Sequence, residues 1–303
     1  MKNKLPTVSI AVSAYNEEEN IEKFLNSVLN QTVKGYKLKE IVVISDGSTD
    51  ATVEKINMLR NKKIKVIVDR KRIGKSYRLN QIYSHVNSDI LIQSDADVLF
   101  SGRNVISSII KPLIKDSSVA MCGGHPTPMK AVTFTERAVN STFEVYSKLR
   151  SELRGGNNVF SADGRLLAYR KKLYKQINVP HDMIANDAYT YFVCITNNFT
   201  YRYVPNAVVK FRSPQDLKDQ IRQNTRFVSA VIRMSRIFDK NVVTKEYHIP
   251  LHLKTIYMAE QFVKNPAGCA YIYLVNIYCK LRAIKVEKKL NAKWAMANTT
   301  KKI

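Results

Sequence analysis

Short apolar runs alternate with segments of helical periodicity along the first part of the chain. The apolar runs are rich in Val and Ile, as strands are, and comprise residues 8–15, 40–45, 65–69 and 89–97. The segments between them place apolar residues at helical spacing and comprise residues 18–31, 50–60 and 75–86. This alternation predicts an α/β fold with a Rossmann-like, mostly parallel central sheet and helices on both of its faces.

The remainder of the chain is predicted to be mainly helical. Its predicted helices are residues 133–153, 187–196 and 213–237. Residues 155–170 are predicted to be a polar loop leading into a strand, and a further strand is predicted over residues 201–209. A Tyr-rich apolar segment over residues 268–279 precedes a basic tail. That segment is a dozen residues long, whereas a membrane-spanning helix needs about 20, so no such helix is expected.

The charge of the chain points to an anionic partner. Its 49 Lys and Arg against 25 Asp and Glu give a formal net charge of +24, which suits nucleic acid, lipid headgroups or a phosphorylated substrate. The four cysteines lack the Cys-x-x-Cys spacing of zinc or redox sites, and no signal-peptide pattern opens the sequence. We therefore expect reduced thiols and a cytoplasmic location.

Polar clusters follow three of the predicted strands. They are residues 14–18, 45–50 and 94–97, and the carboxyl ends of parallel strands are where such sheets bind ligands. Asp95 and Asp97 stand two apart, so in extended backbone both carboxylates would point to one side. Paired carboxylates suit Mg²⁺ or Mn²⁺, although a bare Asp-x-Asp is more often a solvated acidic turn.

Two further elements suit a nucleotide diphosphate. Asp46 follows the second strand and can accept a hydrogen bond from a base, while Gly47 permits a tight turn. Gly74 and Lys75 precede a predicted helix, whose free N–H groups and cation could face phosphates. The surrounding residues lack the spacing of a Walker loop.

In order and spacing, these elements resemble the family 2 glycosyltransferases, which have the GT-A fold, over roughly residues 7–235. The resemblance implies nucleotide contacts, diphosphate or ribose contacts and a metal ligand. The residues implied are Tyr15, Glu17 and Asp46 for the nucleotide, Lys75 and Asp95 for the diphosphate or ribose, and Asp97 for the metal, with Asp95 beside it.

The same family places its catalytic base at the second residue of a Glu-Asp pair about ninety residues after the metal motif. Here Asn186-Asp187 occupies that place, so Asp187 is the predicted base, with Asn where the family usually has Glu. Such a base removes the proton of the acceptor hydroxyl during an inverting displacement. An ordinary helix cap is the structural alternative for this pair.

A Gln-x-x-Arg-Trp motif of the family is matched by Gln223 to Phe227, with Phe in place of Trp. Gln223 and Arg226 are three apart on one predicted helix face, so the Arg can meet a donor phosphate. A solvated basic helix is the alternative. We expect His125, His181 and Arg165, in loops bordering this region, to be structural.

The resemblance also implies a domain organisation. We expect a catalytic domain over residues 1–240, with a donor half at 1–125 and an acceptor half at 126–240, and a basic, Tyr-rich, amphipathic extension at 241–303. The extension could lie on an anionic membrane, at the inner face of the cell membrane, or pack on the catalytic domain.

The sequence therefore predicts an inverting glycosyltransferase. It would move a sugar from a nucleotide-sugar donor, with a UDP-sugar favoured, to a hydroxyl of a glycan or lipid-linked acceptor. A sugar-phosphate nucleotidylyltransferase is the first alternative, but the sequence near the N-terminus, VSAYNEEENI, has no Gly-rich nucleotide loop. A nucleic-acid-binding protein is the second, and no nucleic-acid motif supports it, so no nucleic-acid partner is expected.

Overall fold

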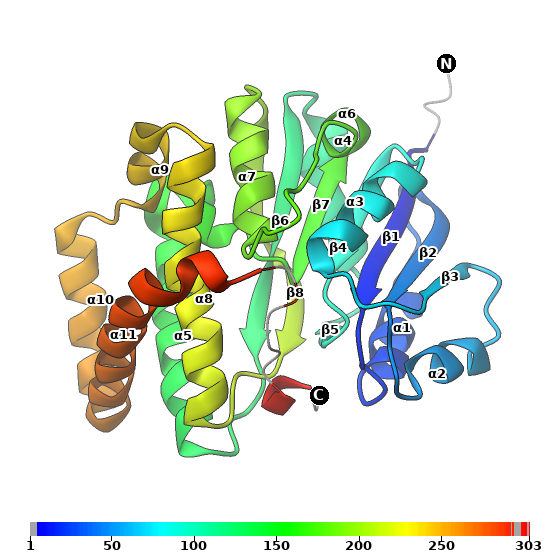
Figure 1. Ribbon diagram of the computed structural model, residues 1–303. Coiled ribbons are helices and arrows are strands. Elements are labelled where there is room, and N and C mark those ends of the chain that lie inside the picture. The colour runs from blue at the N-terminus through cyan, green and yellow to red at the C-terminus, as the bar shows by residue number, and fades with distance from the viewer. Residues whose placement is uncertain (1–4, 292, 294–297, 302) are drawn as a thin grey trace.

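One sheet organises the chain in the computed structural model, which describes residues 5–291, 293, 298–301 and 303. Its eight strands have the order β3-β2-β1-β4-β7-β6-β8-β5 (Figure 1). The strands are β1 (Thr7–Ala14), β2 (Lys37–Asp46), β3 (Ile64–Asp69), β4 (Ile90–Ser94), β5 (Val98–Phe100), β6 (Val119–Pro128), β7 (Leu166–Arg170) and β8 (Thr200–Phe211).

Helices connect these strands and form most of the last third of the chain. The α-helices are α1 (Ile21–Leu29), α2 (Thr52–Met58), α3 (Lys75–His85), α4 (Val105–Lys115), α5 (Phe134–Glu152), α6 (Lys171–Tyr174), α7 (Asn186–Thr196), α8 (Leu217–Ile237), α9 (Lys240–Tyr247), α10 (Leu251–Lys264) and α11 (Pro266–Val286). Short 3₁₀ helices are η1 (Leu153–Gly156), η2 (Val159–Ser161), η3 (Glu287–Lys289) and η4 (Asn298–Thr300). The predicted strands and helices of the first 100 residues are present, except that the strand predicted over residues 89–97 ends at Ser94 and β5 follows separately.

The direction of the strands changes halfway across the sheet. β3, β2, β1 and β4 are all parallel, as predicted. β7 then runs antiparallel to both β4 and β6, β6 is parallel to β8, and β5 is antiparallel to β8. Four of these seven pairings are parallel, so the sheet is mixed, with its parallel pairs concentrated in the N-terminal half.

Both faces of the sheet are buried under helices, as predicted for this fold class. Along β1, Val8 and Ile10 belong to a core shared with α1 and α4, whereas Ala11 belongs to a second core shared with α3 and α7. Strand side chains alternate between faces, so nearly every residue of a central strand must be apolar. This explains the continuous Val and Ile runs of the sequence.

The C-terminal helices pack on the rest of the chain. Val243 of α9 is fully buried in the second core with Met234 and Phe192. α11 packs against α8 and α5, and α10 against α5 and α11 (Figure 1). Within the described residues, no helix has both the length and the hydropathy needed to cross a bilayer.

Candidate active site

The loops that follow β1 and β2 are fastened to each other. The backbone N–H of Asn16 donates to Ser48 Oγ at 3.2 Å, and its side-chain Oδ1 accepts from the N–H of Thr49 at 2.9 Å. The N–H of Glu17 donates to Thr52 Oγ1 at 2.8 Å. Asn16 has a φ of +52°, which asparagine tolerates better than most residues. Two of the predicted polar clusters therefore form one connected rim at the carboxyl edge of the sheet.

Asp46 holds the loop that leads into α3. Its Oδ1 accepts from Arg78 Nε at 2.8 Å and from the N–H of Ile73 at 2.9 Å, and its Oδ2 accepts from the N–H of Gly74 at 3.0 Å. Arg78 is 1% exposed, so this ion pair is buried. A carboxylate oxygen can accept two hydrogen bonds, which leaves Oδ2 one acceptor position. The nucleotide contact of Asp46 stays a prediction, beside this observed role in positioning the loop.

Tyr15 faces the same loop across Gly47. The Arg72 guanidinium lies over the Tyr15 ring, 4.2 Å from its centroid, in a cation–π contact. Gly47 has a φ of +71°, and a Cβ there would lie 2.6 Å from the Arg72 backbone nitrogen. Only glycine fits this approach, so the turn and the Arg72 loop are packed together. The predicted contact of Tyr15 with a nucleotide remains untested.

Asp95 and Lys75 form an ion pair at the start of α3. Lys75 is the first residue of that helix and follows Gly74, whose φ is +109°. Both side chains are about a quarter exposed, so they border the site and are open to a ligand. The predicted position of Asp95 directly after β4 is confirmed.

Asp97 lies in the bend between β4 and β5. The bend replaces the extended backbone expected for residues 95–97, yet the two carboxylates still interact. Burial and the negative charge of Asp95 raise the pKa of Asp97, against the opposing effects of Arg165 and Lys301. Burial also raises the pKa of Glu17 to about 7, with Asp97 adding to the effect. Three acids, Glu17, Asp95 and Asp97, thus share one region, and their charges disfavour one another.

Asp187 joins this region from the first turn of α7. Its Oδ1 accepts from the N–H of Ala188 at 2.9 Å, and its Oδ2 accepts from the N–H of Gly164 at 3.3 Å. Burial and the nearby Asp163 raise the pKa of Asp187, although Lys75 and Arg226 act in the opposite direction. A carboxylate with a raised pKa is better suited to accept a proton.

Arg226, on α8, connects the acids of the two halves. Burial lowers the pKa of Arg226, while Asp187, Asp95 and Asp97 all attract its guanidinium and act to raise that pKa. Arg226 also lies over the Phe227 ring, 5.4 Å from its centroid. The structure therefore brings Asp95, Asp97, Asp187 and Arg226 together from elements far apart in the sequence. Gln223 lies on the same helix, and among the described residues no contact assigns it to this group.

Arg165 lies closer to the site than expected from a purely structural loop residue. Its Nη1 pairs with Asp163 Oδ2 at 3.0 Å, and its guanidinium covers the Phe211 ring at 3.7 Å from the centroid. Although burial alone would raise it, Arg165 and Arg150 hold the pKa of Asp163 below its usual range. Arg165 also favours the ionised form of Asp97. It is thus both a packing residue and a source of positive potential at the site.

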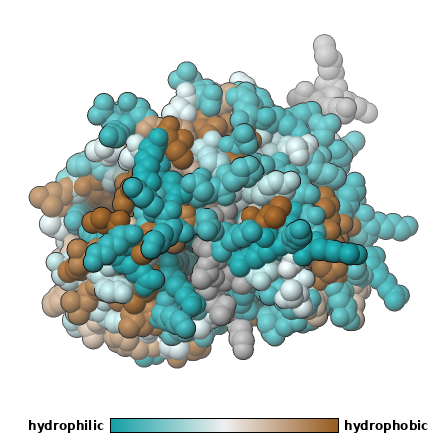
Figure 2. Space-filling view, in the orientation of Figure 1, coloured by the Kyte–Doolittle hydropathy of each residue, from teal (hydrophilic) through white to brown (hydrophobic). Residues whose placement is uncertain are grey.

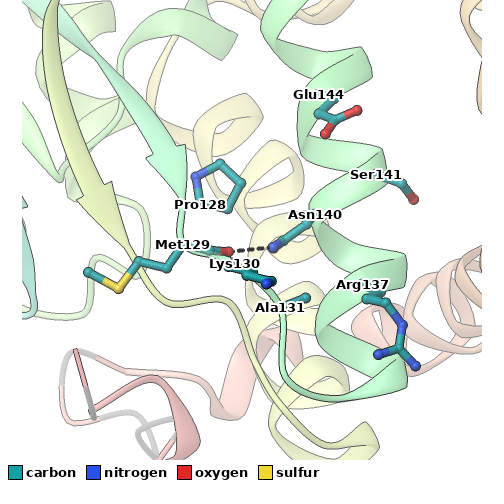
Figure 3. Close-up of a pocket in the computed structure, with 8 residues that line it drawn as sticks. All are labelled: Pro128, Met129, Lys130, Ala131, Arg137, Asn140, Ser141 and Glu144. Carbon is teal, nitrogen blue, oxygen red and sulfur yellow. Dashed lines mark hydrogen bonds between the residues drawn. The ribbon is translucent and has the colours of Figure 1, made fainter.

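A separate pocket of about 330 Å³ lies between the end of β6 and α5 (Figure 3). Asn140 of α5 donates to the backbone oxygen of Met129 at 2.8 Å across its floor. Lys130, Arg137 and Glu144 also line it. None of the predicted site residues lines this pocket, so it is distinct from the group of acids around Arg226.

The sequence profile described as glycosyl transferase family 2 matches residues 9–177. The chain belongs to this family. A second profile, glycosyl transferase family group 2, matches residues 95–286. The enzyme class is therefore that of the glycosyltransferases, as predicted, and neither alternative activity receives support.

Relatives and solved structures agree with this membership. A poly-β-1,6-N-acetyl-D-glucosamine synthase of Staphylococcus aureus is 25% identical over 284 residues, 91% of this chain and 65% of its own length. The chain thus spans slightly less than two thirds of that relative. An uncharacterized glycosyltransferase of Haemophilus influenzae is 34% identical over 123 residues, 40% of this chain and 36% of its own length.

Two solved structures share the fold of this family 2 chain. A mannosyltransferase of Pyrobaculum calidifontis in complex with GDP-Man and Mn²⁺ has a TM-score of 0.62 and 20% identity, covering 95% of this chain and 80% of its own. A glucosyl-3-phosphoglycerate synthase of Mycobacterium tuberculosis with Mn²⁺, UDP and phosphoglyceric acid has a TM-score of 0.52 and 16% identity, covering 76% and 78%. The GT-A fold predicted from the sequence is confirmed.

The acids of the site fit a divalent cation that is completed by substrate. Within the described part of the chain, no group of three or more His, Cys, Asp or Glu side chains is arranged to hold an ion by itself. Mg²⁺ sites commonly use one or two carboxylates together with substrate phosphates and water. Asp97 and Asp95 fit that requirement, because their carboxylates lie close enough for the charge of Asp95 to raise the pKa of Asp97.

Sequence reasoning missed Arg78 as the partner of Asp46, although a signal was present. Arg78 lies on the same apolar helix stripe as Leu79, Ile82 and Tyr83, and an arginine in such a stripe requires a buried acid. The histidines set aside have structural contacts. His125 pairs with the Tyr203 hydroxyl, and His181 stacks on Tyr77.

Proposed function

We propose that this family 2 glycosyltransferase inverts the anomeric carbon of a nucleotide sugar, with Asp187 as the general base. The observation that carries the proposal is the convergence of Asp187, Asp95 and Asp97 on Arg226. One side of this group carries a carboxylate suited to accept a proton, and the other carries carboxylates suited to a cation. An inverting transfer needs the base and the cation close enough to act on the same sugar.

In the proposed reaction, Asp187 takes the proton of the acceptor hydroxyl. The acceptor oxygen forms its bond to the anomeric carbon as the bond from that carbon to the diphosphate oxygen breaks. Arg226 and Lys75 then stabilise the negative charge of the departing nucleoside diphosphate. A Mg²⁺ or Mn²⁺ ion, held by Asp97 and Asp95, would add Lewis-acid stabilisation of the same charge.

The donor proposal is a UDP-sugar. Support comes from the Staphylococcus aureus relative, whose name describes a polymer of N-acetylglucosamine, and from the Mycobacterium tuberculosis structure with UDP. Because the Pyrobaculum calidifontis structure contains GDP-Man, a GDP-sugar is the donor to be tested beside the UDP-sugar. Calorimetry with UDP-, GDP- and dTDP-sugars and Mn²⁺ tests this choice. We expect only the UDP-sugar to bind. If none of the nucleotide sugars bound, the proposal would be refuted.

The pH dependence of transfer follows from the pKa of Asp187. Burial and Asp163 raise that pKa, so the carboxylate becomes protonated at a higher pH than an ordinary aspartate would. A base acts only when deprotonated, so kcat/KM is expected to fall as the pH drops through this raised value. A pH profile of kcat/KM measures this decrease. A profile that stays flat down to the usual aspartate range would contradict the role of Asp187.

The acceptor is proposed to be a hydroxyl of a glycan or of a lipid-linked glycan, reached from the cytoplasmic side of a membrane. α10 and α11 expose an apolar face that supports contact with a membrane, and Figure 2 shows brown residues over these helices. The exposed residues are Leu251, Ile256, Met258, Phe262, Val263, Tyr273, Leu274, Ile277, Tyr278, Leu281 and Ile284. Large exposed apolar patches on proteins mark interaction sites.

Exposed cations on the same helix favour an anionic bilayer as the partner of this apolar face. Lys280, Arg282 and Lys285 alternate with the exposed Leu281 and Ile284 along α11. Basic and apolar residues together are typical of helices that lie in the plane of a membrane. The extension can therefore contact a membrane and pack on the catalytic part at the same time, because the face of α11 opposite the exposed one packs on the catalytic part.

Vesicle co-sedimentation tests the proposed membrane face. We expect the protein to sediment with vesicles containing anionic lipid at low salt, and less as salt screens the cations. The double variant Leu274→Asp and Leu281→Asp should stay in the supernatant, because both side chains are more than 60% exposed and do not support the core. Failure of the unmodified protein to sediment, or dimerisation through this face, would refute the proposal.

A further inference from the structure

A lysine from the end of the described chain lies inside the proposed donor site. Lys301 Nζ donates to the backbone oxygens of Tyr15 and Asn16, each at 2.6 Å, and pairs with Glu17 Oε1 at 2.7 Å. A lysine ammonium has three N–H donors, and these contacts use all three. The Lys301 side chain is 15% exposed, so the contact is well shielded from water.

Residues 298–301 and 303, which we call the strap, are fastened on either side of Lys301. On one side, the N–H and Oγ1 of Thr299 both donate to Asp219 Oδ2 at 2.9 Å, in the first turn of α8. On the other side, the N–H of Ile303 donates to Asn20 Oδ1 at 3.1 Å, at the start of α1. The strap therefore joins the helix that carries Arg226 to the loop after β1, at the carboxyl edge of the sheet (Figure 1).

The charge of Lys301 is placed where a bound cation would act. Its ammonium neutralises Glu17 directly, and it also attracts Asp97, the predicted metal ligand. A divalent ion held by Asp97 would lie near this ammonium, and like charges at close range repel each other. The strap also covers the backbone of Tyr15 and Asn16, next to the predicted nucleotide contacts. A cation held by Asp97 would therefore compete with Lys301 for the attraction of the same acids.

We propose that Lys301 sets the affinity of the donor site, by occupying the place of the cation until metal and nucleotide displace the strap. The proposal rests on the proposed function, because it concerns the same donor site. A protein whose binding-competent form is a minor fraction binds its ligand more weakly by that fraction. The strap therefore lowers the apparent affinity of the site and closes it while no donor is bound.

Calorimetry of the full chain with Mn²⁺ and UDP, and with Mn²⁺ alone, tests this role. We expect Lys301→Ala to tighten the binding of both by about tenfold, as removal of a closed form holding about nine tenths of the molecules would. Lys301→Arg, which keeps the charge, should bind nearly as the unmodified protein does. Lys293→Ala is the matched control, since Lys293 is an exposed lysine of the same region.

Hydrogen exchange provides a readout that does not depend on activity. The amides of Thr299 and Ile303 should exchange faster after Mn²⁺ and UDP are added, and should already be fast in Lys301→Ala. Binding by Lys301→Ala that is unchanged or weaker, relative to Lys293→Ala, would overturn the role of Lys301 alone. Absence of Mn²⁺–UDP and Mn²⁺–GDP binding by the unmodified protein would overturn the proposed function, and this inference with it.

Discussion

Replacing Asp187 with asparagine is expected to lower kcat for sugar transfer by about 10³-fold, within the usual range for loss of a general base. The substitution keeps the size of the side chain and its Oδ1, which accepts from the N–H of Ala188 at 2.9 Å. It removes the proton acceptor while leaving Lys75, Asp97 and Arg226 in place. Steady-state kinetics should therefore show a loss in kcat with little change in the KM for the donor.

Two comparisons decide how this result is interpreted. Asp116→Asn removes an exposed carboxylate near the amino end of β6, at the opposite edge of the sheet, and should leave kcat unchanged. Calorimetry of Asp187→Asn with donor and Mn²⁺ should match the unmodified protein. Near-normal transfer by Asp187→Asn would remove Asp187 from the role of base. Loss of donor binding would instead assign it to the donor site.

The sequence was sufficient to predict the first half of the fold. Runs such as those of β1 and β2 are apolar on both sides because helices cover both faces of the sheet, and few other arrangements bury such strands. The second half was less predictable. The antiparallel direction of β7 depends on how the loop before it returns across the sheet, and no residue pattern in a strand specifies its direction.

The candidate site was predictable where its residues end strands or begin helices. Asp95, Asp97 and Asp187 occupy such positions, so their convergence follows from the topology of the fold. Contacts between distant segments were not predictable in this way. The contact of Lys301 with Glu17 joins segments more than 280 residues apart, and a single lysine in a basic tail looks like any solvated lysine.

The acids and the cations of the candidate site offset one another's charge. Glu17, Asp95 and Asp97 repel each other, and burial raises the pKa of Glu17 to about 7 and also raises that of Asp97. Lys75, Arg226 and Lys301 offset part of this repulsion. Such an arrangement costs stability in the free protein, and it is retained where function requires it. Binding of a cation would relieve it.

Replacing Asp97 with alanine is therefore expected to weaken the Mn²⁺-dependent binding of the donor without lowering the stability of the fold. Loss of a predicted metal ligand should weaken Mn²⁺-dependent donor binding by at least about 100-fold, since even supporting residues of metal sites cost about 10–100-fold. Burial and Asp95 raise the pKa of Asp97, so its negative charge is less favourable in the folded protein than in the unfolded chain, and its removal should not lower the melting temperature. Calorimetry and thermal melting without metal measure the two effects, with Asp116→Ala as the control.

Full retention of Mn²⁺-dependent binding would show that Asp97 is not the ligand, whereas a large drop in melting temperature would show a structural role instead.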